Sequence, residues 1–391
     1  MPFVVLSLML CVFGVTTGEF VIAGILPEVA QDLAVSIPTA GLLVSAYAMG
    51  MIVGGPVLTA LTARFARKQL IVVLLTVVVV GNLASALAPT YAVLFAARIV
   101  TSLVTSTFFA YAIVIATATA EPGKQASTVS KLAFGMNLSM ILGAPIGTFI
   151  GTSFGWRYTF VAIAACCALG LAMVLRSVPG GPRAEPGTSA LAELRVFQRR
   201  DVRLAIAVTA IGNIGLLTVF TYFAPLLTSV SGFAPDAVAV LLLVYGCGAT
   251  VGNFVGGWLS DRAPMRSQVG LLAVLAAAFV LFWLVSAGTV STVALVFAVG
   301  ALGFAVIPGM QARILTTAAS APTLAIAVNA SAYQLAAALA AWLGGRVIDA
   351  GFGTASIYLV SAAVTVAGIG VSCYAWTRDG RVVEAARGPL S

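Results

Sequence analysis

The chain has 391 residues, of which 61% are hydrophobic and only 8% are charged. A soluble globular protein carries about 25% charged residues, so the composition excludes a soluble fold and predicts an all-α integral membrane protein. Histidine is absent, which removes the usual metal ligand and general base, and the net charge of +8 lies at the ends of apolar stretches rather than in one patch suited to nucleic acid.

The first apolar stretch, from Pro2 to Pro27, is long enough to cross a bilayer and contains one charged residue, Glu19. Glu19 precedes Pro27 by eight residues, which places its carboxylate roughly 12 Å below the far membrane surface. A carboxylate at that depth is costly, so we predict that Glu19 carries a proton, the alternative being a permanently paired structural carboxylate. A signal peptide is disfavoured, because the stretch lacks a basic start and a small-residue cleavage site.

Twelve candidate spans follow one another along the chain. They cover residues 3–26, 39–61, 69–88, 91–117, 131–152, 157–176, 203–230, 236–259, 268–287, 290–314, 323–345 and 355–376. Residues 177–202 are polar and rich in Pro and Gly, and this linker divides the spans six and six. The sequence therefore predicts six-helix domains at 1–176 and 203–377 and a tail at 378–391.

The basic residues predict the orientation. If the N-terminus is cytoplasmic, sixteen of the twenty Lys and Arg residues fall on the cytoplasmic side. Because cytoplasmic loops carry an excess of Lys and Arg, we expect both termini and the linker in the cytoplasm.

Arg98 lies within the span at 91–117, roughly 10 Å from its outer end and close to the depth of Glu19. We predict that Arg98 tunes the protonation of Glu19. The alternative is an arginine that only ties spans together through backbone carbonyls.

The span at 131–152 contains Gly143, Pro145 and Gly147. Proline removes a backbone hydrogen bond and glycine permits close helix contact, so this motif predicts a bending point, with plain helix packing as the alternative.

Two loops carry charged residues that could form contacts in one conformation and lose them in another. They are Arg64 and Arg67 in the first loop, and Asp261 and Arg262 in the second. The alternative for both loops is simple anchoring by positive charge.

The two halves are related in sequence. A shift of 198 residues places Tyr47 on Tyr245, Gly50 on Gly248, Gly54 on Gly252 and Arg64 on Arg262. Two parallel six-helix repeats with a site between them near the membrane midplane are a known transporter plan.

Candidate pocket residues are the polar or aromatic side chains well inside the spans. They are Tyr47, Phe108, Tyr111, Asn137, Asn213, Tyr222, Asn329, Tyr333 and Gln334. Any one of them is more often a packing residue than a ligand contact. The scarcity of charge among them indicates a neutral or weakly polar, partly hydrophobic substrate.

Together these features resemble the major facilitator superfamily, and within it the twelve-span drug:proton antiporters. Residues 257–262 read Gly-Trp-Leu-Ser-Asp-Arg, similar to the loop signature of that superfamily. The first-half copy departs from it at Thr59 and Ala63, which puts a charge latch there in doubt. Arg98 matches the arginine linked in the family to proton coupling, and residues 143–147 resemble the antiporter motif.

Residues 18–20 and 24–30 are similar to the branch that holds bacterial chloramphenicol-resistance exporters and arabinose-type efflux permeases. In that branch an acid at the place of Glu19 matters for drug and proton handling. The resemblance implies a bacterial inner-membrane antiporter that exports a small neutral drug, with chloramphenicol or another phenicol as first candidate. A sugar or nucleoside exporter is the alternative, and an enzyme or sensor is disfavoured.

The implied cycle has three steps. Substrate enters from the cytoplasm or inner leaflet with Glu19 ionised, an external proton displaces it, and the deprotonated carrier resets. We expect protons, lipid and a small molecule as partners, a monomer, and no nucleic acid, metal or cofactor.

Overall fold

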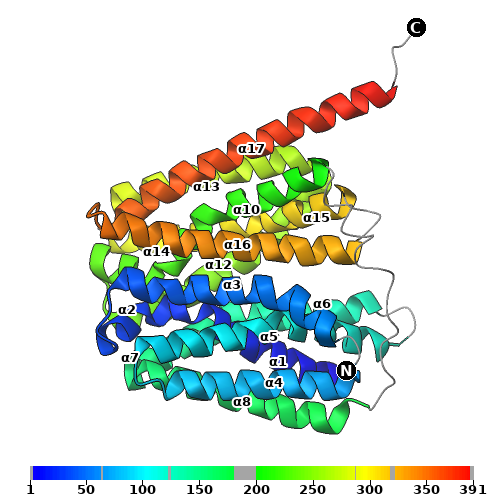
Figure 1. Cartoon of the computed structure of the whole chain (residues 1–391). Coiled ribbons are helices and arrows are strands. Elements are labelled where there is room, and N and C mark those ends of the chain that lie inside the picture. Colours follow the sequence, from blue (N-terminus) through cyan, green and yellow to red (C-terminus); the bar gives the residue numbers. More distant parts are fainter. Residues whose placement is uncertain are drawn as a thin grey trace. The chain divides into compact units, whose positions relative to one another are not determined.

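The computed structural model describes residues 3–62, 65–121, 125–179, 200–286, 288–317 and 322–387 (Figure 1). In the N-terminal part the helices are α1 (Phe3–Phe20), α2 (Ile22–Asp32), α3 (Ile37–Thr62), α4 (Arg67–Ala86), α5 (Tyr91–Ala118), α6 (Gln125–Leu138), η1 (Ser139–Gly143), α7 (Ala144–Phe154) and α8 (Trp156–Ser177). In the C-terminal part they are α10 (Arg200–Thr221), α11 (Phe223–Pro225), η3 (Leu226–Val230), α12 (Pro235–Arg262), α13 (Pro264–Val285), α14 (Thr289–Ala305), α15 (Ile307–Thr317), α16 (Pro322–Asp349) and α17 (Ser356–Arg387).

The predicted all-α membrane fold is confirmed. Eleven stretches in the described part of the chain are helical, long and apolar enough to cross a membrane, and they coincide with eleven of the predicted spans. The twelfth predicted span, 323–345, lies within α16, which carries Asn329 and Gln334 and is not among the eleven.

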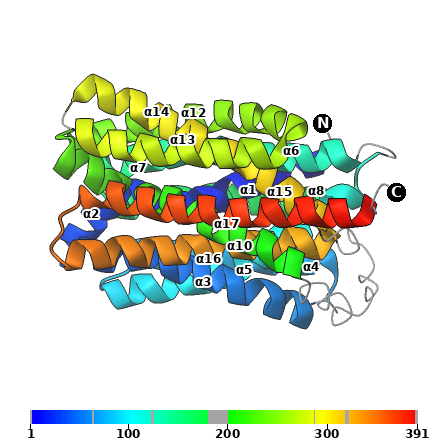
Figure 2. The same cartoon turned by 90° about the horizontal axis from the view of Figure 1, so that it is seen from above.

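The chain forms two compact units. The first comprises residues 1–186 and 221–246, and the second comprises residues 187–220 and 247–391. In the first unit α5 packs against α3 and α4, and α8 packs against α1 and α4. In the second unit α17 packs against α13 and α16 (Figure 2). The domain boundaries expected from the linker stay a prediction, since most of 177–202 lies outside the described residues.

The first span is interrupted, where the sequence predicts one continuous helix. α1 ends at Phe20 and α2 begins at Ile22, with the Val21 N–H bonded to the oxygen of Thr17 and the Val21 oxygen accepting from Gly24. α2 then continues through Pro27 to Asp32. Pro27 has no backbone N–H to donate within α2, and neighbouring groups can satisfy the backbone oxygen that is left without this bond. Glu28 therefore lies in a helix, beyond the predicted span at 3–26.

A row of glycines lets the fifth span approach α1 and α2. Three glycines of η1 and α7, spaced four residues apart, each face a residue of α1 or α2 with the same spacing. The pairs are Gly143 with Thr17, Gly147 with Val21, and Gly151 with Ile25 (Val21 lies at the junction). A Cβ atom at any of the three would overlap the facing side chain. These contacts show helix packing at the predicted motif, and bending there stays a prediction.

The shift of 198 residues also holds for helix contacts. In each unit two glycines of one helix pack against backbone oxygens of a second helix. The pairs are Gly50 with Ile99 and Gly54 with Leu103 in the first unit, and Gly248 with Phe297 and Gly252 with Ala301 in the second. Both members of each pair move by 198 positions, so the repeat seen in the sequence extends to the packing.

Candidate functional site

Arg98 is the centre of a buried polar group in the first unit. Its side chain is only 1% exposed, and its Nη1 donates a hydrogen bond to the backbone oxygen of Gly18 at 2.7 Å. The guanidinium carbon lies 4.1 Å from the ring centroid of Tyr47 and 6.0 Å from that of Phe160. A cation held over an aromatic face is stabilised by the ring quadrupole, most strongly where water is excluded.

Glu19 follows Gly18 directly and is partly buried near the end of α1. It lies within electrostatic range of both Arg98 and Tyr47. The structure thus brings together the two residues predicted to couple protons and one predicted pocket residue. An ionisable carboxyl beside a permanent cation can gain and lose a proton with a change in their mutual attraction.

The α-helical period of α5 explains why its polar residues gather on one face. Arg98, Thr101 and Thr105 are spaced three and four residues apart. Each threonine hydroxyl donates to a backbone oxygen four residues earlier, and the Thr105 hydroxyl also pairs with the Tyr47 hydroxyl at 3.0 Å. The Tyr47 ring is therefore held by its hydroxyl, which bonds Thr105, and by the guanidinium of Arg98 over its face.

Two of the guanidinium nitrogens of Arg98, Nε and Nη2, are buried and have no hydrogen-bond partner within the described residues. A buried donor that lacks a partner is costly, and such groups are often bonded to ordered water. The site therefore has room in its hydrogen bonding for a further acceptor.

Other predicted pocket residues of the first unit are placed differently. Phe108 and Tyr111 are buried on α5, and Tyr222 is buried where α10 gives way to α11, with its hydroxyl against Gly41. Asn137 is exposed on α6. It makes no contact with the group around Arg98 that the structure gives, and its place in a binding pocket stays a prediction.

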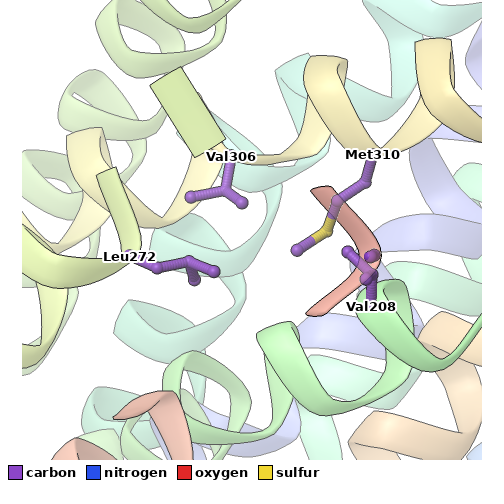
Figure 3. Close-up of a cluster of buried hydrophobic side chains, with 5 residues drawn as sticks. Val208, Leu272, Val306 and Met310 are labelled. Carbon is purple, nitrogen blue, oxygen red and sulfur yellow. The ribbon is translucent and has the colours of Figure 1, made fainter. Parts of the chain in front are cut away.

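In the second unit, Asn213 and Asn329 form a separate polar group through Thr209, among apolar residues. Asn213 donates to the Thr209 backbone oxygen at 2.7 Å and to the Met310 sulfur at 3.1 Å, and Asn329 accepts from the Thr209 hydroxyl at 2.6 Å. Met310 also packs in the apolar cluster with Val208 (Figure 3). On α16, Gln334 is buried and Tyr333 is partly exposed.

The structure describes three of the four loop residues that were predicted to form conformation-dependent contacts. Arg262 stacks 3.9 Å from the Trp258 ring centroid and donates to the Trp258 backbone oxygen at 3.3 Å, while Asp261 is exposed beside it. Arg67 begins α4, and its Nε is buried without a partner among the described residues. Arg64 lies outside the described residues.

A polar cluster at the end of α2 was not predicted. The Asp32 carboxylate accepts from Arg157 and, at 3.1 Å, from the indole N–H of Trp156, and Arg157 also donates to the Ala88 oxygen at 3.0 Å. The hydrogen bond from Arg157 holds the pKa of Asp32 below its ordinary value of 3.8. In the sequence, Asp32 and Arg157 are opposite charges near the ends of two predicted spans. Opposite charge alone does not identify which residues pair.

Gly18, Thr105 and Phe160 were also missed. Thr105 could have been found from its spacing of seven residues after Arg98, which keeps it on the same helix face. Gly18 acts through its backbone oxygen, which leaves no side-chain signal. Within the described residues, no group of three or more His, Cys, Asp or Glu side chains is arranged to hold a metal ion.

Comparison with known proteins gives consistent matches over most of the chain. The sequence pattern of the Major Facilitator Superfamily matches residues 8–340. The chain is 36% identical to the inner membrane transport protein YdhP of Escherichia coli (strain K12), over 92% of each chain. It is 33% identical to a chloramphenicol resistance protein of Streptomyces lividans, over 94% of this chain and 95% of that protein.

The fold has a solved counterpart as well. A crystal structure of a D-xylose-proton symporter aligns with a TM-score of 0.76, covering 96% of this chain and 98% of that one. The two sequences are 16% identical, so the likeness concerns the fold.

Proposed function

The chain belongs to the Major Facilitator Superfamily, and we propose that this multi-span membrane transporter is a proton-driven exporter of a small, neutral, partly hydrophobic compound. The observation that carries the proposal is the position of Glu19 beside the buried guanidinium of Arg98.

The proposed coupling follows from charge. Arg98 remains protonated at any working pH, so it attracts Glu19 when the carboxyl is ionised and not when it is neutral. Substrate binds from the cytoplasm or inner leaflet while Glu19 is ionised. A proton from outside then neutralises Glu19 and displaces the substrate, and the carrier returns to release that proton inside.

The candidate pocket residues within each unit favour a substrate with few charges. Phe108, Tyr111 and Tyr222 are buried aromatic residues of the first unit, and Asn213 and Asn329 supply amides in the second. Aromatic walls with a few hydrogen-bonding groups suit a neutral molecule. The 33% identity to a chloramphenicol resistance protein supports a phenicol as the first substrate to test.

The proposal includes an orientation. With both termini in the cytoplasm, the excess of Lys and Arg lies inside, and the Asp32 cluster and the start of α12 face outward. We propose a bacterial inner-membrane location and a monomer, with protons and lipid as the other partners.

The test is chloramphenicol accumulation in cells with and without the protein, at several external pH values. The variant is Glu19→Gln, and the matched control is Asp236→Asn, which changes an exposed acid at the start of α12. We expect the wild type and the control to lower accumulation, a proton uncoupler to abolish the effect, and Glu19→Gln to be inactive.

Other results would point elsewhere. Unchanged accumulation with the wild type removes the phenicol, and a screen of sugars and nucleosides follows. Equal export by the wild type and Glu19→Gln at every pH removes Glu19 as the coupling residue.

A further inference from the structure

Residues 221–246 pack against α2, α3 and η1 through three glycines, all within the first unit. We call these contacts the glycine seam. They are Gly41 against the Tyr222 hydroxyl, Gly24 against Thr148 and Leu242, and Gly246 against the backbone of Met140 and Ile141. A Cβ at Gly246 would lie 2.9 Å from the Ile141 Cα and the Met140 oxygen. The seam is thus a closed contact with no room for water between these groups.

Glu28 belongs to the face of α2 that enters the seam. It follows Gly24 by four residues within one helix, so both lie on the same side of α2. Its side chain is only partly exposed, and its Oε2 is buried without a hydrogen-bond partner among the described residues. Burial raises the pKa of Glu28 above its ordinary value of 4.5, against a weaker opposite effect of its own backbone N–H.

The charged and titratable groups on the elements packed against α2 do not supply a cation for Glu28. On α8, Arg157 is engaged with Asp32, the neighbouring acid of α2 itself, and Tyr158 is exposed. On α3, Tyr47 pairs with Thr105. α7 and α11 contain no such residue, and those of α1 are Glu19 and Cys11. On α12, whose Leu242 faces Gly24, they are Asp236, Tyr245, Cys247, Asp261 and Arg262, and the cation among them, Arg262, lies twenty residues beyond Leu242 and stacks on Trp258. The remaining titratable residues of α8 are Cys166, Cys167 and Arg176, near its far end.

The Thr148 hydroxyl, which faces Gly24 in the seam, is also buried without a partner in the described structure. Both oxygens are buried away from bulk solvent, with no hydrogen bond from the described residues in its place. An ionised carboxylate suffers most from such a loss, because burial penalises the charged form.

We infer that Glu28 is a second proton-binding residue, distinct from Glu19, whose protonation permits the glycine seam to close. In the open state water hydrates the carboxylate, and in the closed state the neutral acid is favoured. Closure and proton uptake are therefore linked, and either one promotes the other.

The sign follows from linkage. The closed state holds the proton more tightly, so closure is favoured as pH falls and disfavoured as pH rises above the ordinary value of 4.5. For one proton, the ratio of closed to open protein changes by up to about tenfold per pH unit within the window between the two pKa values. On the proposed orientation the seam is external, so a carrier lacking a proton would remain open outward. This last statement rests on the proposed function, whereas the linkage itself does not.

The test is the distance between spin labels at Gln31→Cys and Ala234→Cys, two exposed positions on either side of the seam. The full chain, with its five native cysteines replaced by alanine, is measured in lipid nanodiscs from about pH 5 to about pH 8. We expect the short-distance population to grow as pH falls. Glu28→Gln should be closed at every pH, whereas Asp236→Asn, which changes an exposed acid at the start of α12, should keep the response.

Gly246→Ala provides an independent arm, since a methyl group there should hold the seam open at every pH. Gly257→Ala, on the same helix with no neighbour within 4 Å, is its control. Glu28→Ala repeats the main test if the glutamine variant does not fold. A wild type without a pH response, or a response that survives in both Glu28 variants, overturns the inference. A protein that passes this test but exports nothing leaves the linkage standing and removes only the proposed function.

Discussion

Arg98 donates a hydrogen bond from its Nη1 to the backbone oxygen of Gly18, the residue that precedes Glu19. Because the acceptor is a backbone oxygen, this bond does not depend on the protonation of the neighbouring carboxyl. The guanidinium can therefore hold α1 in place while Glu19 changes charge. This position suits a residue that tunes the protonation of Glu19, and it also suits an arginine with a purely structural role. Variants of Arg98 distinguish the two roles.

Arg98→Lys keeps the charge and loses the planar fork, and Arg98→Ala loses both. We expect Arg98→Ala to lower the free energy of unfolding by at least about 1.5–3 kcal/mol, the value of a charge-assisted hydrogen bond. Thermal unfolding in detergent measures this loss. Proton-driven transport at several pH values is the second readout. A tuning role predicts that Arg98→Lys changes the pH dependence of transport, whereas a structural arginine predicts lower stability with an unchanged pH profile.

Tyr47→Phe removes the hydroxyl that pairs with Thr105 and leaves the ring under Arg98. We expect a loss of about 0.5–1.5 kcal/mol in stability and transport within a few-fold of wild type. Tyr47→Leu also removes the ring, and should lose about 0.5–2 kcal/mol more. Tyr91→Phe is the control. The Tyr91 hydroxyl donates to the Thr39 backbone oxygen at 2.6 Å and does not take part in the group around Arg98. Equal transport by the phenylalanine and leucine variants would contradict a role for the ring.

Gly252→Ala should destabilise the second unit, because a methyl group would overlap the backbone of Ala301. Overpacking of this kind costs about 1–3 kcal/mol or more. Gly257→Ala, on the same helix in open space, should be neutral or stabilising by up to about 1 kcal/mol. Gly54→Ala should behave like Gly252→Ala, since Gly54 contacts Leu103 in the same way. Melting temperatures in one detergent compare all three, and similar values for the alanines at 252 and 257 would contradict the contact.

Asp32→Asn should lower the melting temperature near neutral pH by at most about 2–4 °C, because an exposed ion pair contributes no more than about 1 kcal/mol. The bond from Arg157 lowers the pKa of Asp32, so its contribution is fully present above the ordinary value of 3.8 and is lost as pH falls through the folded value. The difference between wild type and variant should therefore be constant above about pH 5 and shrink below about pH 4. A difference that grew on acidification would contradict this sign.

Hydropathy in the sequence was enough to predict the membrane spans that the structure describes, because apolar length is a direct physical requirement of a bilayer. The orientation predicted from the basic residues stays a prediction. The depths of Glu19 and Arg98 below the same membrane surface, estimated from helix rise, were enough to predict that the two residues lie close together. The shift of 198 residues also relates positions whose residue types differ, such as Ile99 and Phe297, because each contacts the equivalent glycine. Repeated packing leaves a trace in sequence because only glycine fits at the contact points.

The remainder depended on tertiary contacts. Val21 has no proline or glycine beside it that would signal a break, and Pro27, which suggests an end, lies inside α2. Asp32 and Arg157 meet across more than a hundred residues, and complementary charges alone do not select that pair. The assignment of Asn137 to the pocket rests on depth alone and stays a prediction, because depth does not determine which side of a helix faces inward.

The contact of Gly50 and Gly54 with α5 has a consequence for how the carrier moves. Tyr47 lies about one turn before Gly50 on α3, and Arg98 lies one turn before Ser102, the residue that Gly50 touches on α5. Backbone held against backbone permits little sliding, so the tyrosine ring and the guanidinium form a fixed frame. On the proposed function, Glu19 changes charge beside this frame, and the junction at Val21 is the nearest break in helical structure at which the chain can adjust. Engineering a faster or slower carrier should therefore begin at this junction rather than at the arginine.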